Sequence, residues 1–113
     1  SLSLLVAQAF HKQPAATFRT PINLDGDRFN CRADNIEWRP RWFANKYFRQ
    51  FLYEPAGIRR PIIEISTHEK FENSWEAATK YGLLDLEILT ATVQHTYVCP
   101  TFQMFEIIRQ SRY

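Results

Sequence analysis

Glycine and cysteine are scarce in this sequence, and long hydrophobic runs are missing. Only three of the 113 residues are glycine and two are cysteine. So little glycine, with no tract of biased composition, excludes collagen, mucin-like stalks and flexible-linker proteins. The longest mainly apolar stretch runs from Leu2 to Phe10 and contains Gln8. It is well short of the ~20 residues that cross a bilayer, so we expect no membrane span.

Export and metal-binding signals are also lacking. The first residues have neither the positive start nor the small-residue cleavage site of an export signal. Cys31 and Cys99 are far apart, and no Cys-x-x-Cys occurs, which argues against a disulfide framework or a zinc ribbon. His95 and Cys99 can share a helix face, but two ligands fall short of the four that structural zinc needs. We therefore expect a cytoplasmic protein with no metal and no other cofactor.

Charge is distributed unevenly along the chain, although its net value is only +2. Residues 1–60 hold ten Lys and Arg against five acids, whereas residues 61–113 hold four against seven. Basic charge in one half attracts polyanions, although a solvated surface explains it equally well. Pro55 and Gly57 interrupt any helix at this cut. The sequence therefore predicts a module over residues 1–53, a linker over 54–60 and a second module over 61–113.

The first half is expected to alternate helix, two strands and helix. Gly26, between Asp25 and Asp27, is suited to a tight turn with positive φ. Trp38 is the expected packing anchor of the second strand. The predicted order is helix Leu2–Phe10, strand Phe18–Leu24, a turn and a polar loop to Asn35, strand Ile36–Arg39, and a helix from Pro40 to about Tyr53.

The last of these helices has an apolar face and a basic stripe. Phe43, Tyr47 and Phe51 recur at helical spacing and should face the core. An adjacent stripe contains Trp42, Lys46 and Arg49. The stripe is expected either to contact phosphate or simply to be solvated.

The second half is expected to be a short hairpin followed by two helices. The predicted elements are strand Arg60–Ser66, strand Lys70–Phe71, helix Ser74–Tyr81 with Asn73 as N-cap and Gly82 as stop, and helix Asp85–Gln94 packing through Leu86, Leu89 and Val93. Two short helices joined by glycine indicate a helix-turn-helix, or any small pair of helices. The expected fold class is therefore α+β.

Three segments of the first half, Leu5–Phe10, Asn23–Asn30 and Asp34–Trp38, read L-V-A-Q-A-F, N-L-D-G-D-R-F-N and D-N-I-E-W. They resemble the pattern L-V-A-x-x-F, N/D-H-x-D-G-N-x-x-N-N and x-N-L-x-W of the phage HNH homing endonucleases, which fold as a ββα-metal hairpin. The resemblance implies that Asp25 and Gly26 form the turn, that Asn30 and Asn35 bond their own loop, and that Trp38 fills the core.

The positions that would carry catalysis in this family are occupied by unsuitable residues. In the family, an Asp holds a divalent cation, a His acts as general base, and an Asn or His on the helix completes the metal site. In a gapless alignment these roles fall on Ile22, Asn23 and Ala44. None of these side chains supplies the chemistry. A shifted register that recruits His11, Asp25, Asp27 or Asn45 remains open.

The second half resembles the small modular DNA-binding domain that often follows HNH homing endonucleases. Its pattern is matched by Pro61–Ser66, Phe71, Asn73, Ala77, Ala78 and Gly82, and less closely by Phe102–Ile107. A helix that enters the major groove usually presents basic or amide side chains at its start. Here the expected exposed residues are Asp85 and Glu87, which repel phosphate. Readout by this helix is therefore doubtful, and the module is equally suited to docking on a protein.

We therefore expect an HNH-like protein, of phage origin, that binds DNA or RNA without cutting it. Such a protein would work in the host cytoplasm. Two alternatives stay open: an interaction protein that docks on a host enzyme or viral assembly, and an active endonuclease with a rebuilt site. The sequence does not distinguish DNA binding from RNA binding, and it does not indicate the oligomeric state or whether a longer N-terminal region is missing. The expected phosphate contacts are Arg28, Arg32, Arg39, Arg41, Lys46 and Arg49.

Overall fold

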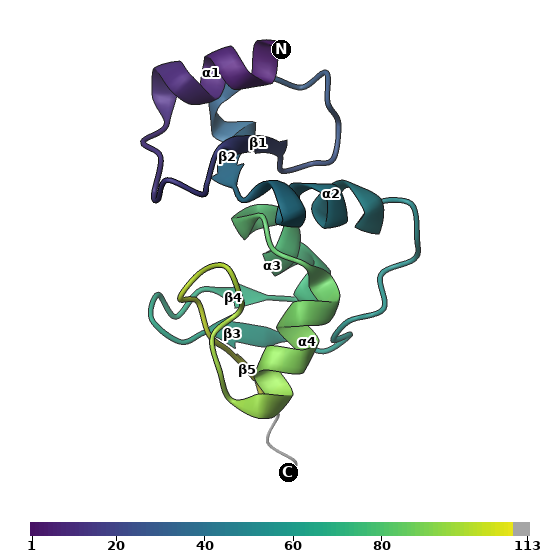
Figure 1. Cartoon of the computed structure of the whole chain (residues 1–113). Helices are drawn as coiled ribbons and strands as arrows, with labels where there is room; N and C mark the ends of the chain where they lie inside the picture. Colours follow the sequence, from purple (N-terminus) through teal and green to yellow (C-terminus); the bar gives the residue numbers. More distant parts are fainter. Residues whose placement is uncertain (110–113) are drawn as a thin grey trace. The chain divides into compact units, whose positions relative to one another are not determined.

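The computed structural model describes residues 1–109 and confirms the α+β class (Figure 1). The chain divides into two compact units, which we call unit 1 (residues 1–54) and unit 2 (from Pro55 onward). Within the described range, no helix combines the length and the apolar character needed to cross a membrane.

Unit 1 is a two-stranded antiparallel sheet between two helices. Strand β1 (Thr20–Asn23) pairs with β2 (Ile36–Arg39) so that Asn23 lies opposite Ile36. Helix α1 (Leu2–Phe10) packs on both strands, and α2 (Arg41–Gln50) packs on β1. A short 3-10 helix, η1 (Ala33–Asn35), leads into β2. The helix Leu2–Phe10 and the strand Ile36–Arg39 are confirmed, while β1 and α2 are shorter than predicted.

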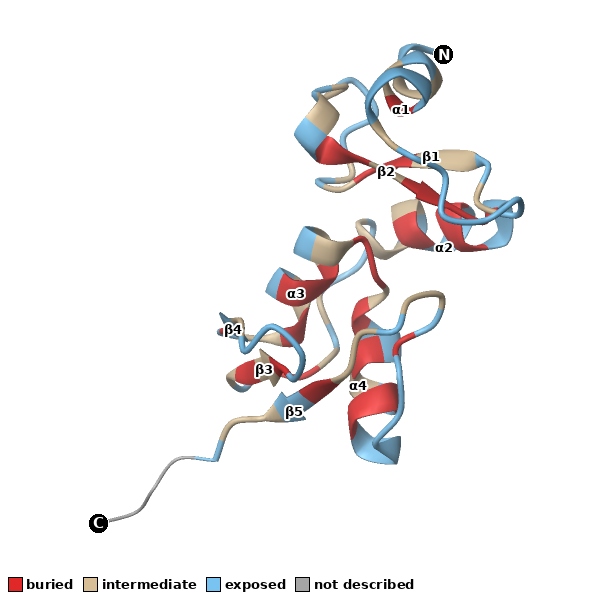
Figure 2. Ribbon diagram, turned by 90° about the vertical axis from the view of Figure 1, so that its left-hand side faces the viewer, coloured by how far each residue is buried: buried red, intermediate tan, exposed pale blue. Residues whose placement is uncertain are grey.

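Buried residues lie on both strands of this sheet and on α1 and α2 (Figure 2). On the α1 face, Ala7, Ile36 and Trp38 form one buried cluster. On the opposite face, Phe43 and Tyr47 of α2 are fully buried, as predicted, with their rings stacked. Tyr47 also donates its hydroxyl to the Leu24 carbonyl at 2.5 Å, which joins α2 to the end of β1.

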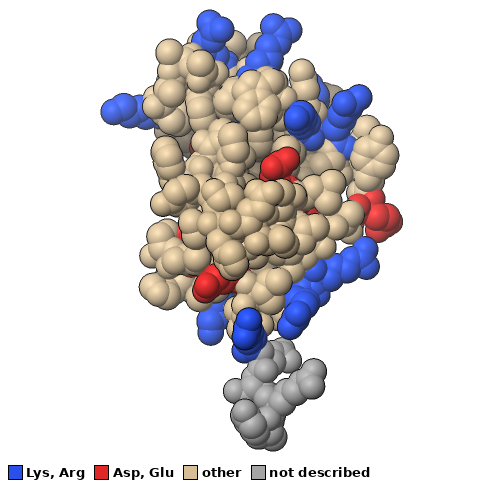
Figure 3. Space-filling model, turned by 60° about the horizontal axis from the view of Figure 1, so that its bottom comes forward, with Lys and Arg blue, Asp and Glu red and all other residues tan. Residues whose placement is uncertain are grey.

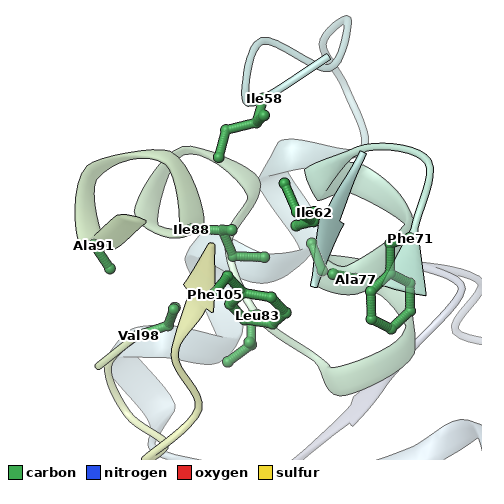
Figure 4. Close-up of a cluster of buried hydrophobic side chains, with 10 residues drawn as sticks. Ile58, Ile62, Phe71, Ala77, Leu83, Ile88, Ala91, Val98 and Phe105 are labelled. Carbon is green, nitrogen blue, oxygen red and sulfur yellow. The ribbon is translucent and has the colours of Figure 1, made fainter. Parts of the chain in front are cut away.

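Unit 2 is a three-stranded antiparallel sheet covered by two helices. The strand order is β4 (Lys70–Phe71), β3 (Ile62–Glu64), β5 (Phe105–Ile107). Helices α3 (Ser74–Tyr81) and α4 (Asp85–Gln94) pack against each other, and α4 also contacts β5. Figure 4 shows Ile62, Ile88 and Phe105 pointing into one core between these layers. Strand β3 is shorter than predicted, whereas β4 and both helices have the predicted bounds.

The predicted caps of α3 are confirmed. The Asn73 side chain accepts a hydrogen bond from the Glu76 amide at 3.0 Å, as an N-cap does. Gly82 ends the helix with φ of 71°, and its amide donates to the Ala78 carbonyl. These local signals were readable because the partners lie within four residues of each other.

The predicted inward face of α4 is wrong at two positions. Leu86 and Val93 are 57% and 68% exposed, whereas Ile88 and Ala91 are buried. The true buried face starts at Asp85, whose carboxylate accepts hydrogen bonds from the Gly57 amide and the Ser74 hydroxyl. Leu89 packs against the core of unit 2 as predicted.

The anchored Asp85 also extends unit 2 into the predicted linker. The Gly57 amide donates to Asp85, and the Ile58 amide donates to the Ser74 hydroxyl oxygen at 2.7 Å. Ile58 is itself buried in the core of unit 2. Residues 57 and 58 therefore belong to unit 2 rather than to a free linker.

Candidate nucleic-acid interface

The three positions that would be catalytic in an HNH enzyme are buried in unit 1. Ile22 is fully buried on the side of β1 that packs on α2, and Ala44 is only 3% exposed. Asn23, also buried, donates from Nδ2 to the Asn30 carbonyl at 3.0 Å and to Ser3 Oγ at 3.2 Å. The Asn23 side chain therefore joins β1 to the loop and to α1 as a hydrogen-bond donor. A general base instead needs a nitrogen or oxygen atom that accepts a proton.

The residues proposed for a shifted register do not form a metal cluster. Within residues 1–109, no three His, Cys, Asp or Glu side chains come together in a way that would hold an ion. His11 Nε2 bonds the Ala33 carbonyl at 2.5 Å, and the carbonyl of His11 accepts from the Trp38 indole. His11 thus joins α1 to η1 and β2.

The turn after β1 is held by a network around Asp25. Asp25 Oδ1 accepts from the Asp27 amide and from Asn35 Nδ2, both at 2.9 Å, and Oδ2 accepts from Asn30 Nδ2 at 2.7 Å. Asn35 Nδ2 also donates to the Asn30 carbonyl at 2.9 Å. Gly26 has φ of 79°. The predicted structural roles of Asp25, Gly26, Asn30 and Asn35 are confirmed, and so is that of Trp38 in the core.

This network makes the stability of unit 1 dependent on pH. Burial by itself raises the pKa of Asp25, but hydrogen bonds from Asn30, the Asp27 amide and Asn35 outweigh it and hold the pKa below the ordinary 3.8. A lowered carboxyl pKa stabilises the fold above the unfolded-state value, and this stabilisation disappears as pH falls through the folded-state value. We expect unit 1 to lose stability below about pH 4.

The measurement is the exchange protection of the Leu24 amide, which donates to the Asn35 carbonyl, as a function of pH. Asp25→Asn should flatten this acid dependence. Asp34→Asn, which removes only an exposed pair with Arg32, should leave the wild-type profile. If Asp25→Asn loses as much protection at low pH as the wild type does, the acid dependence does not arise from Asp25.

Five of the six predicted phosphate contacts lie at the surface of unit 1. Arg39 is the exception: it is only 6% exposed, and its guanidinium donates to the Trp38 carbonyl at 2.7 Å. Burial lowers its pKa, with nearby Glu37 acting in the opposite direction. Arg39 therefore stabilises the β2–α2 junction, and the prediction that it contacts phosphate is wrong.

The remaining cations differ in how firmly they are held. The Arg28 guanidinium lies 4.1 Å from the centre of the Phe48 ring, a cation–π contact that orients it. Arg32 pairs with Asp34 at the surface. Lys46 lies 5.6 Å from the Trp42 ring, and Arg41 and Arg49 are exposed on α2. The basic stripe on α2 is confirmed as a surface feature.

A cleft of about 500 Å³ lies between the turn and the end of α2. Arg28 and Arg49 line it together with aromatic rings and with the polar side chains of Asp27 and Asn45, among others. Phe29 also lines this cleft and is 94% exposed. Sequence reasoning missed Phe29, although an aromatic residue directly after a tight turn and a basic residue was a readable signal. A smaller cleft of about 290 Å³ is lined by Asn23, Ala44 and Arg28, among others.

Unit 2 is less acidic than the sequence division suggested. Because unit 2 begins at Pro55, it includes Arg59 and Arg60, so six Lys and Arg stand against seven acids, for a net charge of −1. Unit 1 has eight against five, for a net charge of +3. Figure 3 shows basic side chains gathered beside the end of the described chain. A cleft of about 560 Å³ there is lined by Arg60, His95, Glu106 and Arg109, among others.

The start of α4 also differs from the prediction. Asp85 is 4% exposed, so only Glu87 presents a carboxylate to solvent there. At the start of α4, phosphate would therefore be repelled by one exposed carboxylate, that of Glu87, rather than by the predicted two. Several apolar residues of unit 2 are also more than half exposed: Leu86 and Val93 on α4, and Tyr97 and Phe102 after it.

Comparisons of the chain with protein-family models, with curated proteins and with solved structures find no match.

Proposed function

We propose that this protein binds nucleic acid through unit 1 without cutting it, on a scaffold of the HNH type. The observation that carries the proposal is the set of exposed cations around the turn and α2: Arg28, Arg41, Lys46 and Arg49. Cations on one element attract the regularly spaced phosphates of a backbone. The site of action we propose is the cytoplasm, that of the host if the protein is phage-encoded.

The absence of cutting is proposed from the chemistry of three side chains. A cation ligand and a general base are both needed to activate water for hydrolysis of a phosphodiester. Ile22 and Ala44 carry no ligand atom, and the amide of Asn23 has no basic pKa near neutrality. The two hydrogen bonds that Asn23 donates give this residue a structural role rather than a catalytic one.

The test removes two charges from α2 and compares the result with two removed elsewhere. The double variant Lys46→Gln/Arg49→Gln should weaken binding of a mixed-sequence oligonucleotide about tenfold or more. The slope of log K against log salt should become shallower by about 1.8 on a duplex and about 1.4 on a single strand. Lys12→Gln/Lys70→Gln, both exposed, has the same net charge and should leave the affinity within about twofold of wild type.

Equal losses in the two double variants would show that binding depends only on net charge and would overturn the proposed surface. The assay is run with and without Mg²⁺. Metal-dependent nicking that the charge variant abolishes would contradict the absence of cutting and favour the rebuilt endonuclease.

A pair of exposed aromatic residues in unit 2 favours a second candidate, docking on a protein. Tyr97 and Phe102 pack edge to face at 5.9 Å and remain 55% and 87% exposed. Paired exposed aromatics of this kind are enriched at protein interfaces. Failure of the purified wild-type protein to bind any DNA or RNA, with stable co-purification of a protein partner, would replace the first proposal with this one.

A further inference from the structure

We propose that the cleft between the turn and the end of α2 holds one unstacked nucleobase of the bound strand. This inference rests on the proposed nucleic-acid binding and specifies the form of the ligand: a single-stranded or extruded nucleotide. The cleft is lined by Gly26, Asp27, Arg28, Phe29, Asn45, Phe48, Arg49, Phe51 and Leu52.

The size and the lining of the cleft suit a base. Its volume of about 500 Å³ lies in the range of small-ligand sites. Three aromatic rings line the cleft, those of Phe29, Phe48 and Phe51. Arg28 stacks on Phe48 and the turn lies on Phe51, so the exposed Phe29 ring is the surface on which the flat face of a nucleobase can stack. A stacked base in a duplex has no free face, so this cleft selects an unstacked one.

Glycine at position 26 allows the turn to lie close to the Phe51 ring, which lines the cleft. A Cβ built at Gly26 would lie 2.7 Å from the Phe51 ring, and its φ of 79° also favours glycine. The turn therefore lies directly on Phe51, and the ring supports the turn from beneath. The absence of a side chain at residue 26 is what allows this close approach.

The backbone at Phe29 is held in position, and its ring is exposed. Its amide donates to Asp27 Oδ1 at 2.9 Å, and the Asn30 amide donates to the Asp27 carbonyl at 3.0 Å. These bonds order the backbone on both sides of the ring before any ligand arrives. Preorganisation of this kind lowers the entropic cost of stacking on a base.

Charge and polarity around the rings fit a nucleotide rather than an apolar ligand. Arg28, stacked on Phe48 at 4.1 Å, and Arg49 place two guanidinium groups beside the cleft for the flanking phosphates. Asn45 is exposed at the cleft and supplies both a donor and an acceptor, the pairing that suits adenine. Asp27 is the one carboxylate of the lining, and one of its oxygens already accepts from the Phe29 amide.

The test compares Phe29→Ala with Phe102→Ala, a control that removes another highly exposed ring, in unit 2. The probes are a single DNA strand of about eight nucleotides, within the usual site size, and the same strand annealed to its complement. Phe29→Ala should weaken single-strand binding about tenfold to a hundredfold, because stacking on one base carries that much affinity. Duplex binding and the salt slope should stay unchanged, and Phe29→Trp should restore affinity. Phe102→Ala should behave as wild type.

A second readout reports on the base itself. A strand carrying 2-aminopurine should brighten on binding as that base leaves its neighbours, and Phe29→Ala should reduce the change. Unchanged single-strand affinity in Phe29→Ala, or an equal loss on duplex and single strand, would overturn the cleft while leaving binding by the α2 cations intact. Wild-type protein that binds neither probe would overturn both proposals.

Discussion

Replacing Asp85 with alanine is expected to destabilise unit 2 by about 3 kcal/mol, because it removes the acceptor of the partly buried Gly57 amide and the shorter of the two hydrogen bonds that the buried Ser74 hydroxyl makes to an acceptor. Asp85 is 4% exposed, and its Oδ2 accepts from the Gly57 amide at 2.9 Å while Oδ1 accepts from the Ser74 hydroxyl. A unit of about 55 residues has only about 3 to 8 kcal/mol in total. The substitution should therefore unfold a large part of the population of unit 2.

The stability of the Asp85 variants is measured by amide exchange at Gly57 and Ile58 in increasing urea. The Gly57 amide donates to Asp85, and the Ile58 amide donates to the Ser74 hydroxyl oxygen. Asp85→Asn keeps one acceptor oxygen and should lose less stability than alanine. Glu87→Ala removes the same charge from an exposed position on the same helix and should change stability by less than about 0.5 kcal/mol. A loss in Asp85→Ala as small as that in Glu87→Ala would show that the anchoring contributes little.

Replacing Asn35 with alanine is expected to cost unit 1 a similar amount and to abolish single-strand binding. Asn35 is 8% exposed; its Oδ1 accepts from the Asp25 amide at 3.1 Å, and its Nδ2 donates to Asp25 Oδ1 and the Asn30 carbonyl. Removing these three bonds costs about 3 kcal/mol. It also frees the turn that positions Arg28 and Phe29.

The control for Asn35 is the nearly isosteric Asn35→Asp, which retains Oδ1 but turns the donor into a second acceptor. It would place a carboxylate against Asp25 Oδ1 and should be at least as damaging near neutral pH as alanine. Stability is measured by exchange of the Leu24 amide, and binding by titration of the single strand used for Phe29. If the Asn35→Ala variant keeps wild-type stability and wild-type binding, the hydrogen bonds of Asn35 do not stabilise unit 1 as proposed.

The sequence was most informative where partners lie close along the chain. The turn at Gly26, the Asn73 cap and the Gly82 stop each depend on hydrogen bonds or dihedral angles within a few residues. The aromatic face of α2 followed from helical spacing alone, since Phe43 and Tyr47 differ by one turn and both are buried. These features need no knowledge of distant segments.

The errors arose where the environment of a polar or apolar side chain depends on distant residues. Arg39 and Asp85 were expected at the surface, because charged residues are rarely buried without partners. Asp85 finds its partners at Gly57 and Ser74, 28 and 11 residues away. Leu86 is exposed because this anchoring, rather than hydrophobicity alone, orients α4.

The α+β class, the order of the elements and the turn after β1 could all be predicted from the sequence, because they depend on local periodicity and side-chain type. The same holds for the lack of a metal-ligand atom in Ile22 and Ala44 and of a basic group in Asn23. The exposure of each cation, and the position of Phe29 with Arg28 and Arg49 around one cleft, could be read from the folded chain alone. Both depend on packing between segments that are far apart in the chain, and the sequence pattern contains no distances between such segments.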